Sequence, residues 1–331
     1  MVTKTTKEIT DMKKIFIALA ALATIAACNK AEVIETQEGE QIAFSNAFVE
    51  NTTKAAVDPS LGTTANPFKK FNVWGTVGGV PIYAGAEVTG EVGSTTVDDK
   101  EVANIWTCTS VKQYWVKDAH YKFSALATSS HDHNEESTCC NVTLGEEDKL
   151  PAKITVDATA ANVDLLYAEP VERTGVASGN EPVEFTFKHL LSKVKFTVKN
   201  NSQDATDYSF DVKDITITCP KRGTIKLADK TWENLSSAAA YTVQPVTVDN
   251  SLPSKECENE LLLIPGTVSI NYAVDIKCGG ETIATYNLAE PHTPTLVGGH
   301  SYNFIVRVSV GEEITFSVDD NPSWIDSEVI F

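Results

Sequence analysis

The sequence predicts an all-β fold built from two antiparallel β-sandwich domains. Three observations predict it: apolar and polar residues alternate over several segments, glycine- and proline-rich turns separate these segments, and no long helical stripe follows residue 27. Short strands with one buried face that follow one another closely are typical of sandwiches. Because roughly 300 residues remain after residue 27, which exceeds one typical domain, we expect two domains.

The strands are predicted from segments in which every second residue is apolar. Such residues line one face of a strand and face the core, while the residues between them face solvent. The clearest stripes are Tyr208, Phe210 and Val212; Ile270, Tyr272, Val274 and Ile276; Val194, Phe196 and Val198; and Tyr302, Phe304, Val306, Val308 and Val310.

Turns are predicted where glycine, proline or asparagine interrupt the alternation. We expect the short segment after Cys278 to join two strands as a hairpin. The predicted turns are Gly78 and Gly79, Asn200 and Asn201, residues 220–223, Gly279 and Gly280, and Gly298 and Gly299.

The domain boundary is predicted near residue 180. Residues 169–182 are rich in proline, glycine, glutamate and serine and show no periodicity, as linkers do. The expected organisation is a signal peptide at residues 1–27, an acidic tether at 28–40, an N-terminal β-sandwich domain at 41–180 and a C-terminal one at 181–331.

The N-terminus has the pattern of a bacterial lipoprotein signal. Lys13 and Lys14 precede an apolar run over residues 15–27, which is short for a membrane span but typical of a signal-peptide core. The run ends in two alanines followed by Cys28, as in the lipoprotein cleavage box. We expect the Cys28 thiol to carry a lipid that holds the exported precursor at the outer membrane. An ordinary signal peptide cut before an incidental Cys28 is the alternative.

The charge of the chain argues against nucleic acid as a partner. Without residues 1–27 the chain keeps 23 basic and 43 acidic residues, because that segment holds four of the lysines and two of the acids. The resulting charge of −20 repels nucleic acid and anionic lipid headgroups. Solubility at a crowded cell surface accounts for this acidity.

Six cysteines remain after Cys28, and an even number outside the cytoplasm permits disulfides. Their pairing is left open, because six cysteines allow 15 connectivities. A core of this size does not require the bridges.

Motifs that carry chemistry are few. His131 and His133, followed by Cys139 and Cys140, are weak metal-ligand candidates, but their spacing fits no structural zinc site and the segment resembles a polar loop. The sequence lacks a Gly-x-Ser-x-Gly elbow, a His-Glu-x-x-His motif and a phosphate-binding glycine loop. We therefore expect no enzymatic activity, no catalytic residues, no cofactor and no metal. Trp106, Tyr114 and Trp115 could form a sugar-binding platform, but in a sandwich such residues more often fill the core.

Several short segments form a recognisable series along the chain. They are residues 163–168 (VDLLYA), 185–194 (FTFKHLLSKV), 298–302 (GGHSY), 314–318 (ITFSV) and Trp324, with residues 42–45 and 121–125 upstream. Each segment is weak alone, but in this order they resemble the fimbrillin family, the Mfa-like and FimA-type fimbrial subunits of Bacteroides-type bacteria.

The resemblance implies two transthyretin-like sandwich domains and assembly by donor-strand exchange. In this family a protease removes the lipid-bearing segment with the first strand, and a C-terminal strand of the next subunit fills the groove. Here the displaced strand would span residues 41–49, with Ile42, Phe44 and Phe48 facing inward. Ile314, Phe316 and Val318, or a neighbouring strand, would be the donor.

One departure from the family concerns the cleavage site. The best-known members are cut after an arginine, but this chain has only Arg173, Arg222 and Arg307. The first basic residue after the displaced strand is Lys54, so cleavage between Lys54 and Ala55 is the expectation, and an uncut anchored subunit is the alternative.

The expected function is a structural and adhesive subunit of fimbriae on the cell surface. Its expected partners are other fimbrial subunits, in a homo- or heteropolymer, a host or bacterial surface ligand, and the outer membrane through the lipid. A monomeric carbohydrate-binding surface lipoprotein and a hydrolase are the alternatives.

Overall fold

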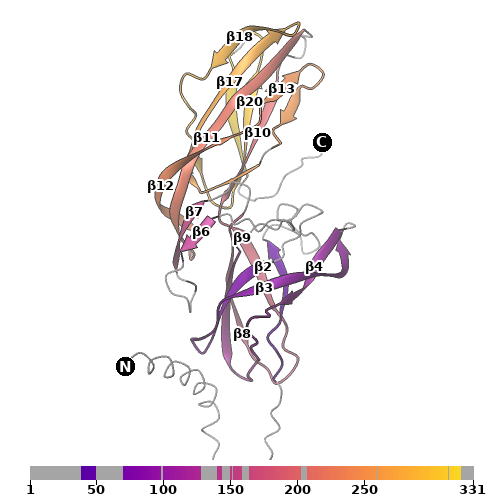
Figure 1. Cartoon of the computed structure of the whole chain (residues 1–331), viewed down its shortest axis with the longest axis vertical. Coiled ribbons are helices and arrows are strands. Elements are labelled where there is room, and N and C mark those ends of the chain that lie inside the picture. Colours follow the sequence, from indigo (N-terminus) through magenta and orange to yellow (C-terminus); the bar gives the residue numbers. More distant parts are fainter. Residues whose placement is uncertain are drawn as a thin grey trace, which may run out of the picture. The chain divides into compact units, whose positions relative to one another are not determined.

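The computed structural model contains only β-strands as regular elements among the residues that it describes, which confirms the all-β prediction (Figure 1). Within that part of the chain, no helix is both long and apolar enough to cross a membrane. The described residues are 39–49, 70–97, 100–127, 140–143, 150, 152–158, 164–202, 207–258, 260–311 and 313–321.

Seven strands pair side by side into a sheet that closes on itself as a barrel. Their order around the barrel is β1, β4, β3, β2, β5, β8 and β9. All neighbours in this barrel are antiparallel except β1 and β9, which run parallel. The strands are β1 (Phe44–Val49), β2 (Lys70–Val77), β3 (Val80–Val97), β4 (Lys100–Thr107), β5 (His120–Ala127), β8 (Leu166–Thr174) and β9 (Val183–His189).

The remaining strands form two larger sheets and one two-stranded sheet of β16 and β19. One larger sheet has the order β14, β10, β20 and β21, with β15 also on β10; the other has the order β18, β17, β11, β7 and β6, with β12 and β13 also on β11. The strands are β6 (Cys140–Thr143), β7 (Lys153–Ala158), β10 (Ser192–Asn200), β11 (Tyr208–Lys226), β12 (Thr231–Thr242), β13 (Val246–Asp249), β14 (Ser254–Glu256), β15 (Leu261–Leu263), β16 (Gly266–Thr267), β17 (Ser269–Cys278), β18 (Glu281–Asn287), β19 (Thr295–Leu296), β20 (Ser301–Val308) and β21 (Thr315–Asn321).

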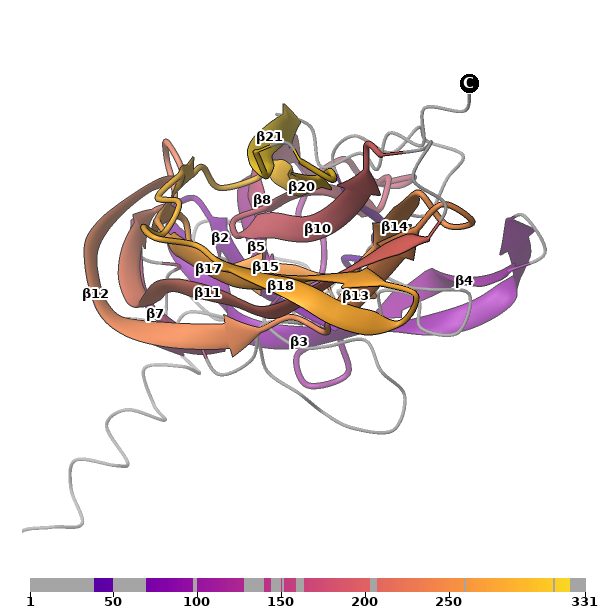
Figure 2. The same ribbon diagram turned by 90° about the horizontal axis from the view of Figure 1, so that it is seen from above.

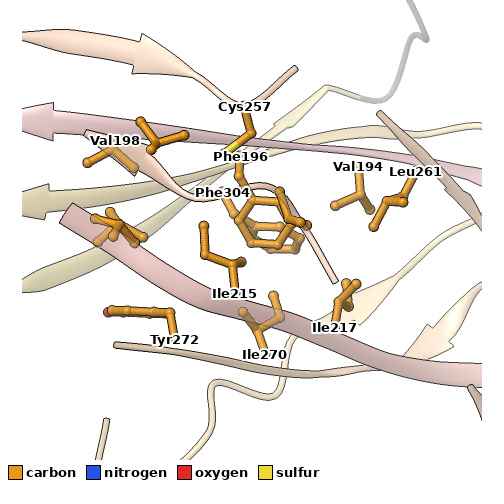
Figure 3. Close-up of a cluster of buried hydrophobic side chains, with 14 of the residues drawn as sticks. Val194, Phe196, Val198, Ile215, Ile217, Cys257, Leu261, Ile270, Tyr272 and Phe304 are labelled. Atoms are coloured by element: carbon orange, nitrogen blue, oxygen red, sulfur yellow. The ribbon is translucent and has the colours of Figure 1, made fainter. Parts of the chain in front are cut away.

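The two larger sheets pack face to face as a sandwich. Figure 2 shows β10, β20 and β21 in one layer and β11, β17 and β18 in the other. Between the layers, the rings of Phe196 and Phe304 lie 5.3 Å apart, and Ile215, Ile217 and Ile270 lie opposite them (Figure 3). Burying such side chains from water is the main favourable contribution to folding.

The predicted alternation is confirmed where it was clearest. Val194, Phe196 and Val198 on β10 and Phe304 and Val306 on β20 are all at most 1% exposed. The Gly78–Gly79 turn joins β2 to β3, and the Gly279–Gly280 turn joins β17 to β18 in the expected hairpin. All four glycines have positive φ, which other L-residues rarely adopt.

The turn predicted at residues 220–223 is wrong, because this segment lies inside the long strand β11. Along one edge, β11 pairs with β17 as far as Thr218 and then with β7 from Arg222 onward. Pro220 lies between these two partners. A proline lacks the N–H that a strand donates, so it is tolerated where one edge of the strand is unpaired.

Lys193 on β10 is a further difference from the expected solvent-facing pattern. Its side chain is 1% exposed, and its ammonium group lies 3.2 Å from the Glu260 carboxylate. β10 pairs with β20 on one edge and with β14 and β15 on the other. Buried residues of β10 fall at both odd and even positions of the strand, so strict alternation does not hold there. A buried lysine requires an anionic partner, which Glu260 provides.

The residues of the predicted N-terminal domain do not all pair within the barrel. β6 and β7 belong to the sheet of β11. A shared core cluster contains Trp74 of β2, Tyr167 of β8, Val156 of β7 and Ile225 of β11. Residues Gly39–Phe331 form one compact unit. The boundary near residue 180 stays a prediction, and the last passage from barrel to sandwich strands falls between His189 and Ser192.

Two segments that carry the family resemblance meet where the chain makes this passage. The His189 ring bonds to the Asp164 carboxylate, and the two side chains are 3% and 7% exposed. The Leu190 N–H donates to the Leu165 carbonyl at 3.0 Å. The two motifs, about 20 residues apart in the sequence, are therefore in direct contact in the fold.

A third segment of the resemblance, residues 298–302, lies against the same passage. The Gly299 N–H donates to the Leu191 carbonyl at 2.8 Å, and the Lys193 N–H donates to the His300 carbonyl at 2.9 Å. A Cβ on Gly298 would come within 2.8 Å of the Leu190 oxygen, so only glycine fits this close approach.

Candidate assembly site

β1 is the strand that closes the barrel. It is the neighbour of both β4 and β9, pairing with β4 at Phe44 and Trp106 and with β9 from Phe44 to Val49. Among the described strands, only β1 pairs with both β4 and β9. Removing β1 would therefore leave one unpaired backbone edge on β4 and one on β9, which is the arrangement that accepts an added strand.

The side chain of Phe44 anchors β1 in the barrel core. It is 4% exposed, and its ring lies 5.7 Å from that of Tyr83, 6.1 Å from Phe185, 6.2 Å from Phe71 and 6.4 Å from Phe123. Ile42 precedes it on the same face and is 2% exposed. If β1 left, the Phe44 site would be an apolar pocket lined by four aromatic rings.

The segment before β1 is held by hydrogen bonds to two loops. The Ile42 N–H donates to the Gln113 carbonyl at 2.8 Å, and the Val183 N–H donates to the Ala43 carbonyl at 2.8 Å. The Glu40 carboxylate accepts 2.8 Å bonds from the backbone and side-chain N–H groups of Asn180. These donors, the backbone N–H first, lower the pKa of Glu40 because they stabilise its charged form.

Two of the predicted donor residues, Phe316 and Val318, lie on the edge strand β21, and Ile314 immediately precedes it. Among the described strands, β21 pairs with β20 alone, from the Arg307–Thr315 pair to the Ser301–Asn321 pair. Ile314 and Phe316 are half-buried and pack against the sandwich core, whereas Val318 is 38% exposed. The strand thus combines an apolar face with a backbone edge that has no neighbouring strand in the described sheet.

Phe316 is held by a stack of rings. Its ring lies 3.9 Å from that of His292, at an angle of 9°, and 5.5 Å from that of Phe304. The backbone of His292 bonds to Ile270 through N–H···O contacts of 2.8 and 3.0 Å. Burial lowers the pKa of His292, because it disfavours the charged imidazolium.

Several predicted site residues lie outside the described residues. They are Cys28, Lys54, Ala55, His131 and His133, and the side chain of Phe48 is outside as well. Within the described part of the chain, no three histidine, cysteine, aspartate or glutamate side chains gather as a metal site would require.

The aromatic platform considered for sugar binding does not form. Trp106 and Trp115 are each 6% exposed and belong to the barrel core, so the interpretation as core residues is confirmed. Only Tyr114 of the three is exposed, at 47%.

The cysteines that the structure describes in full are free thiols: Cys108, Cys219, Cys257 and Cys278. Burial raises the pKa of Cys219 to about 12 and that of Cys257 to about 11, so these two stay protonated. A protonated, buried thiol is a poor nucleophile and a poor metal ligand.

The family follows from comparison with known sequences. A model of the fimbrillin-like family matches residues 53–320. The chain belongs to the fimbrillin-like family. The resemblance seen in the sequence is thereby confirmed, and the matched range starts after β1 and ends within β21.

One solved structure with a TM-score above 0.5 has a similar fold. A fimbrial protein from Bacteroides vulgatus ATCC 8482 superposes with a TM-score of 0.55 and 16% sequence identity, covering 86% of this chain and 99% of that chain. A candidate cell adhesion protein from Bacteroides ovatus ATCC 8483 gives a TM-score of 0.48 and 15% identity, covering 87% and 98%. Comparison with curated proteins gave no match.

Proposed function

We propose that this chain is a structural and adhesive subunit of cell-surface fimbriae that polymerises by strand exchange. The observation that carries the proposal is the position of β1 between β4 and β9 in a chain of the fimbrillin-like family. One strand closes the barrel, and its anchor, Phe44, enters a pocket that another apolar strand can fill.

In this mechanism the lipid on Cys28 delivers the precursor to the outer membrane. Cleavage after Lys54 releases the lipid-bearing segment together with β1. An apolar strand from the C-terminal end of another subunit, containing Ile314, Phe316 and Val318 or a neighbouring stripe, then pairs with β4 and β9. Main-chain hydrogen bonds supply the affinity, and alternate side chains enter the vacated pockets.

Release of β21 is compatible with its position in the sheet. Among the described strands it pairs only with β20, so its release breaks one ladder of hydrogen bonds and uncovers Phe304 and His292. A strand held on one edge detaches at lower cost than a central strand does.

Electrophoresis of the mature protein without boiling tests this proposal. Wild-type protein is expected to give a ladder of SDS-resistant multimers, and deletion of residues 311–331 is expected to abolish it. Lys54→Gln should also abolish the ladder by preventing cleavage, whereas the matched change Lys69→Gln should leave it unchanged. A full ladder from the deletion variant would exclude the C-terminal donor.

A further inference from the structure

The segment at the start of β1 and the segment at the start of β21 have nearly the same sequence. Residues 40–45 read EQIAFS, and residues 312–317 read EEITFS. The two segments share a glutamate, an isoleucine, a phenylalanine and a serine at the same spacing. The correspondence gives each residue of an incoming strand a place in the site that residues 40–45 occupy now: Glu312 corresponds to Glu40, Ile314 to Ile42 and Phe316 to Phe44.

The backbone of residues 40–43 is bonded by neighbouring segments on both sides. The Trp115 N–H donates to the Glu40 carbonyl at 2.9 Å, and the Val183 N–H donates to the Ala43 carbonyl at 2.8 Å. Any extended segment can accept these bonds, because they involve main-chain groups alone. The backbone contacts therefore hold an incoming strand but do not decide which of its residues lies where.

The side chain of Glu40 makes a contact that depends on its charge. One carboxylate oxygen, Oε2, accepts bonds of 2.8 Å from both the backbone N–H and the side-chain Nδ2 of Asn180. Hydrogen bonds to an ionised oxygen are stronger than those to a neutral amide oxygen. Asn180 thus distinguishes a carboxylate from an uncharged side chain at this position.

Asn180 is oriented by its own loop as well as by Glu40. Its Oδ1 accepts from the Val176 N–H at 2.8 Å, and its Nδ2 donates to the Val176 carbonyl at 3.1 Å. These two bonds fix the plane of the side-chain amide without any residue of β1. If the segment with Glu40 left, the backbone N–H and the second Nδ2 hydrogen of Asn180 would stay available to another carboxylate.

The apolar residues of the incoming strand select the same register. With Ile314 in the place of Ile42 and Phe316 in the place of Phe44, both buried sites receive the type of side chain that they hold now. The strand then runs as β1 does, parallel to β9 and antiparallel to β4.

A register shifted by two residues is less favourable at two positions. It would bring Val318 to the Phe44 site and leave unfilled space among the aromatic rings that surround that site. The same shift would place Ile314 opposite Asn180, whose two donors would then face an apolar side chain.

We propose that Asn180 binds the carboxylate of Glu312 from another copy of this chain, and that this contact sets the register of the exchanged strand. The Glu312 carboxylate takes the position that Glu40 leaves, and the two apolar residues after it enter the sites already described. Glu313 corresponds to the exposed Gln41 and takes no part. The inference rests on the proposed strand exchange and adds which acceptor residue recognises which donor residue.

Competition by synthetic peptides of residues 311–321 tests the contact. Each peptide is added to subunits cut after Lys54 before they assemble, and the concentration that halves the ladder on unboiled gels is measured. The wild-type peptide is expected to inhibit, and the Glu312→Gln peptide to require a roughly three- to tenfold higher concentration, because it lacks the charged acceptor. The Glu313→Gln peptide is the matched control. It loses the same charge one position along and should inhibit as the wild-type peptide does.

A change in the acceptor tests whether Asn180 is the partner. Asn180→Asp keeps an oxygen for the Val176 N–H but brings a carboxylate towards Glu312, so it should shorten the ladder. Adding Glu312→Gln to the same chain should restore the ladder, because the introduced amide can donate to the introduced carboxylate. Adding Glu313→Gln instead should not restore it.

Three outcomes would overturn the assignment and leave strand exchange intact. Equal inhibition by the Glu312→Gln and Glu313→Gln peptides would remove the carboxylate contact. Restoration of the Asn180→Asp ladder by either glutamate change alike would reduce the effect to overall charge. No inhibition by the wild-type peptide, where a peptide of residues 39–50 does inhibit, would show that another segment is the donor. Absence of any ladder from the wild-type subunit would instead exclude the exchange on which the inference rests.

Discussion

At the scale of single residues, the contact between Asp164 and His189 explains why two distant sequence segments carry the family resemblance. Both side chains are almost fully buried, and the contact sits where the chain passes from the barrel to the sandwich. Buried polar groups are costly unless they bond to each other, so each residue requires the other.

Asp164→Ala is expected to lower the free energy of unfolding by about 2–4 kcal/mol, because it leaves a buried imidazole without the carboxylate that it contacts. Urea denaturation measures the loss. Glu290→Ala, at an exposed position without a positive φ, is the control and should change stability by less than about 0.5 kcal/mol. Equal effects of the two changes would contradict the role of the pair.

The stacked pair of His292 and Phe316 predicts a pH dependence. Burial lowers the pKa of His292 below its ordinary value of 6.5, so the unfolded chain takes up this proton at a higher pH than the folded chain does. The stability that neutral His292 provides is present above that ordinary value and is lost as the pH falls below it.

Urea midpoints at about pH 7.5 and pH 5 for wild type and His292→Phe check this expectation. Phenylalanine keeps an aromatic ring against Phe316 but does not titrate. The variant should lose less stability than wild type on acidification. An identical loss in both proteins would assign the pH dependence to other groups.

At the scale of elements, the proposed exchange depends on β1, whose buried residue Phe44 packs in the barrel core. A synthetic peptide of residues 39–50 should compete with the incoming strand and shorten the ladders formed by subunits cut after Lys54. The same peptide with Phe44→Ala should be a much weaker competitor, because truncating a buried phenylalanine costs about 3–5 kcal/mol. Equal inhibition by both peptides would show that the Phe44 pocket does not accept the strand.

Strand positions were predictable where one face is apolar and the other polar. Alternating apolar and polar residues occur within β10, β11, β17 and β20. This period of two arises because one face of each strand is buried and the other is not. The turn at residues 220–223 was mispredicted, since the local signal of Pro220 and Gly223 does not reveal that β11 changes partners there.

Pairings between distant segments could not be predicted from local patterns. Nothing in the sequence near β7 indicates that it pairs with β11 rather than within the barrel, or that β1 runs parallel to β9.

At the scale of the whole molecule, the barrel strand β1 lies near one end of the described sequence and the apolar edge strand β21 near the other. β1 belongs to the barrel and β21 to the sandwich. Under the proposed exchange, each subunit would therefore accept one strand and donate another. Head-to-tail contacts of this kind produce filaments where the rotation between subunits does not close a ring.

The N-terminal mass of protein sheared from cells tests this account most directly. If the subunit polymerises by exchange of β1, the sheared material starts at Ala55 and lacks both the lipid and residues 41–49. A start at acylated Cys28 with β1 retained would contradict it, because the barrel would then be closed to any incoming strand.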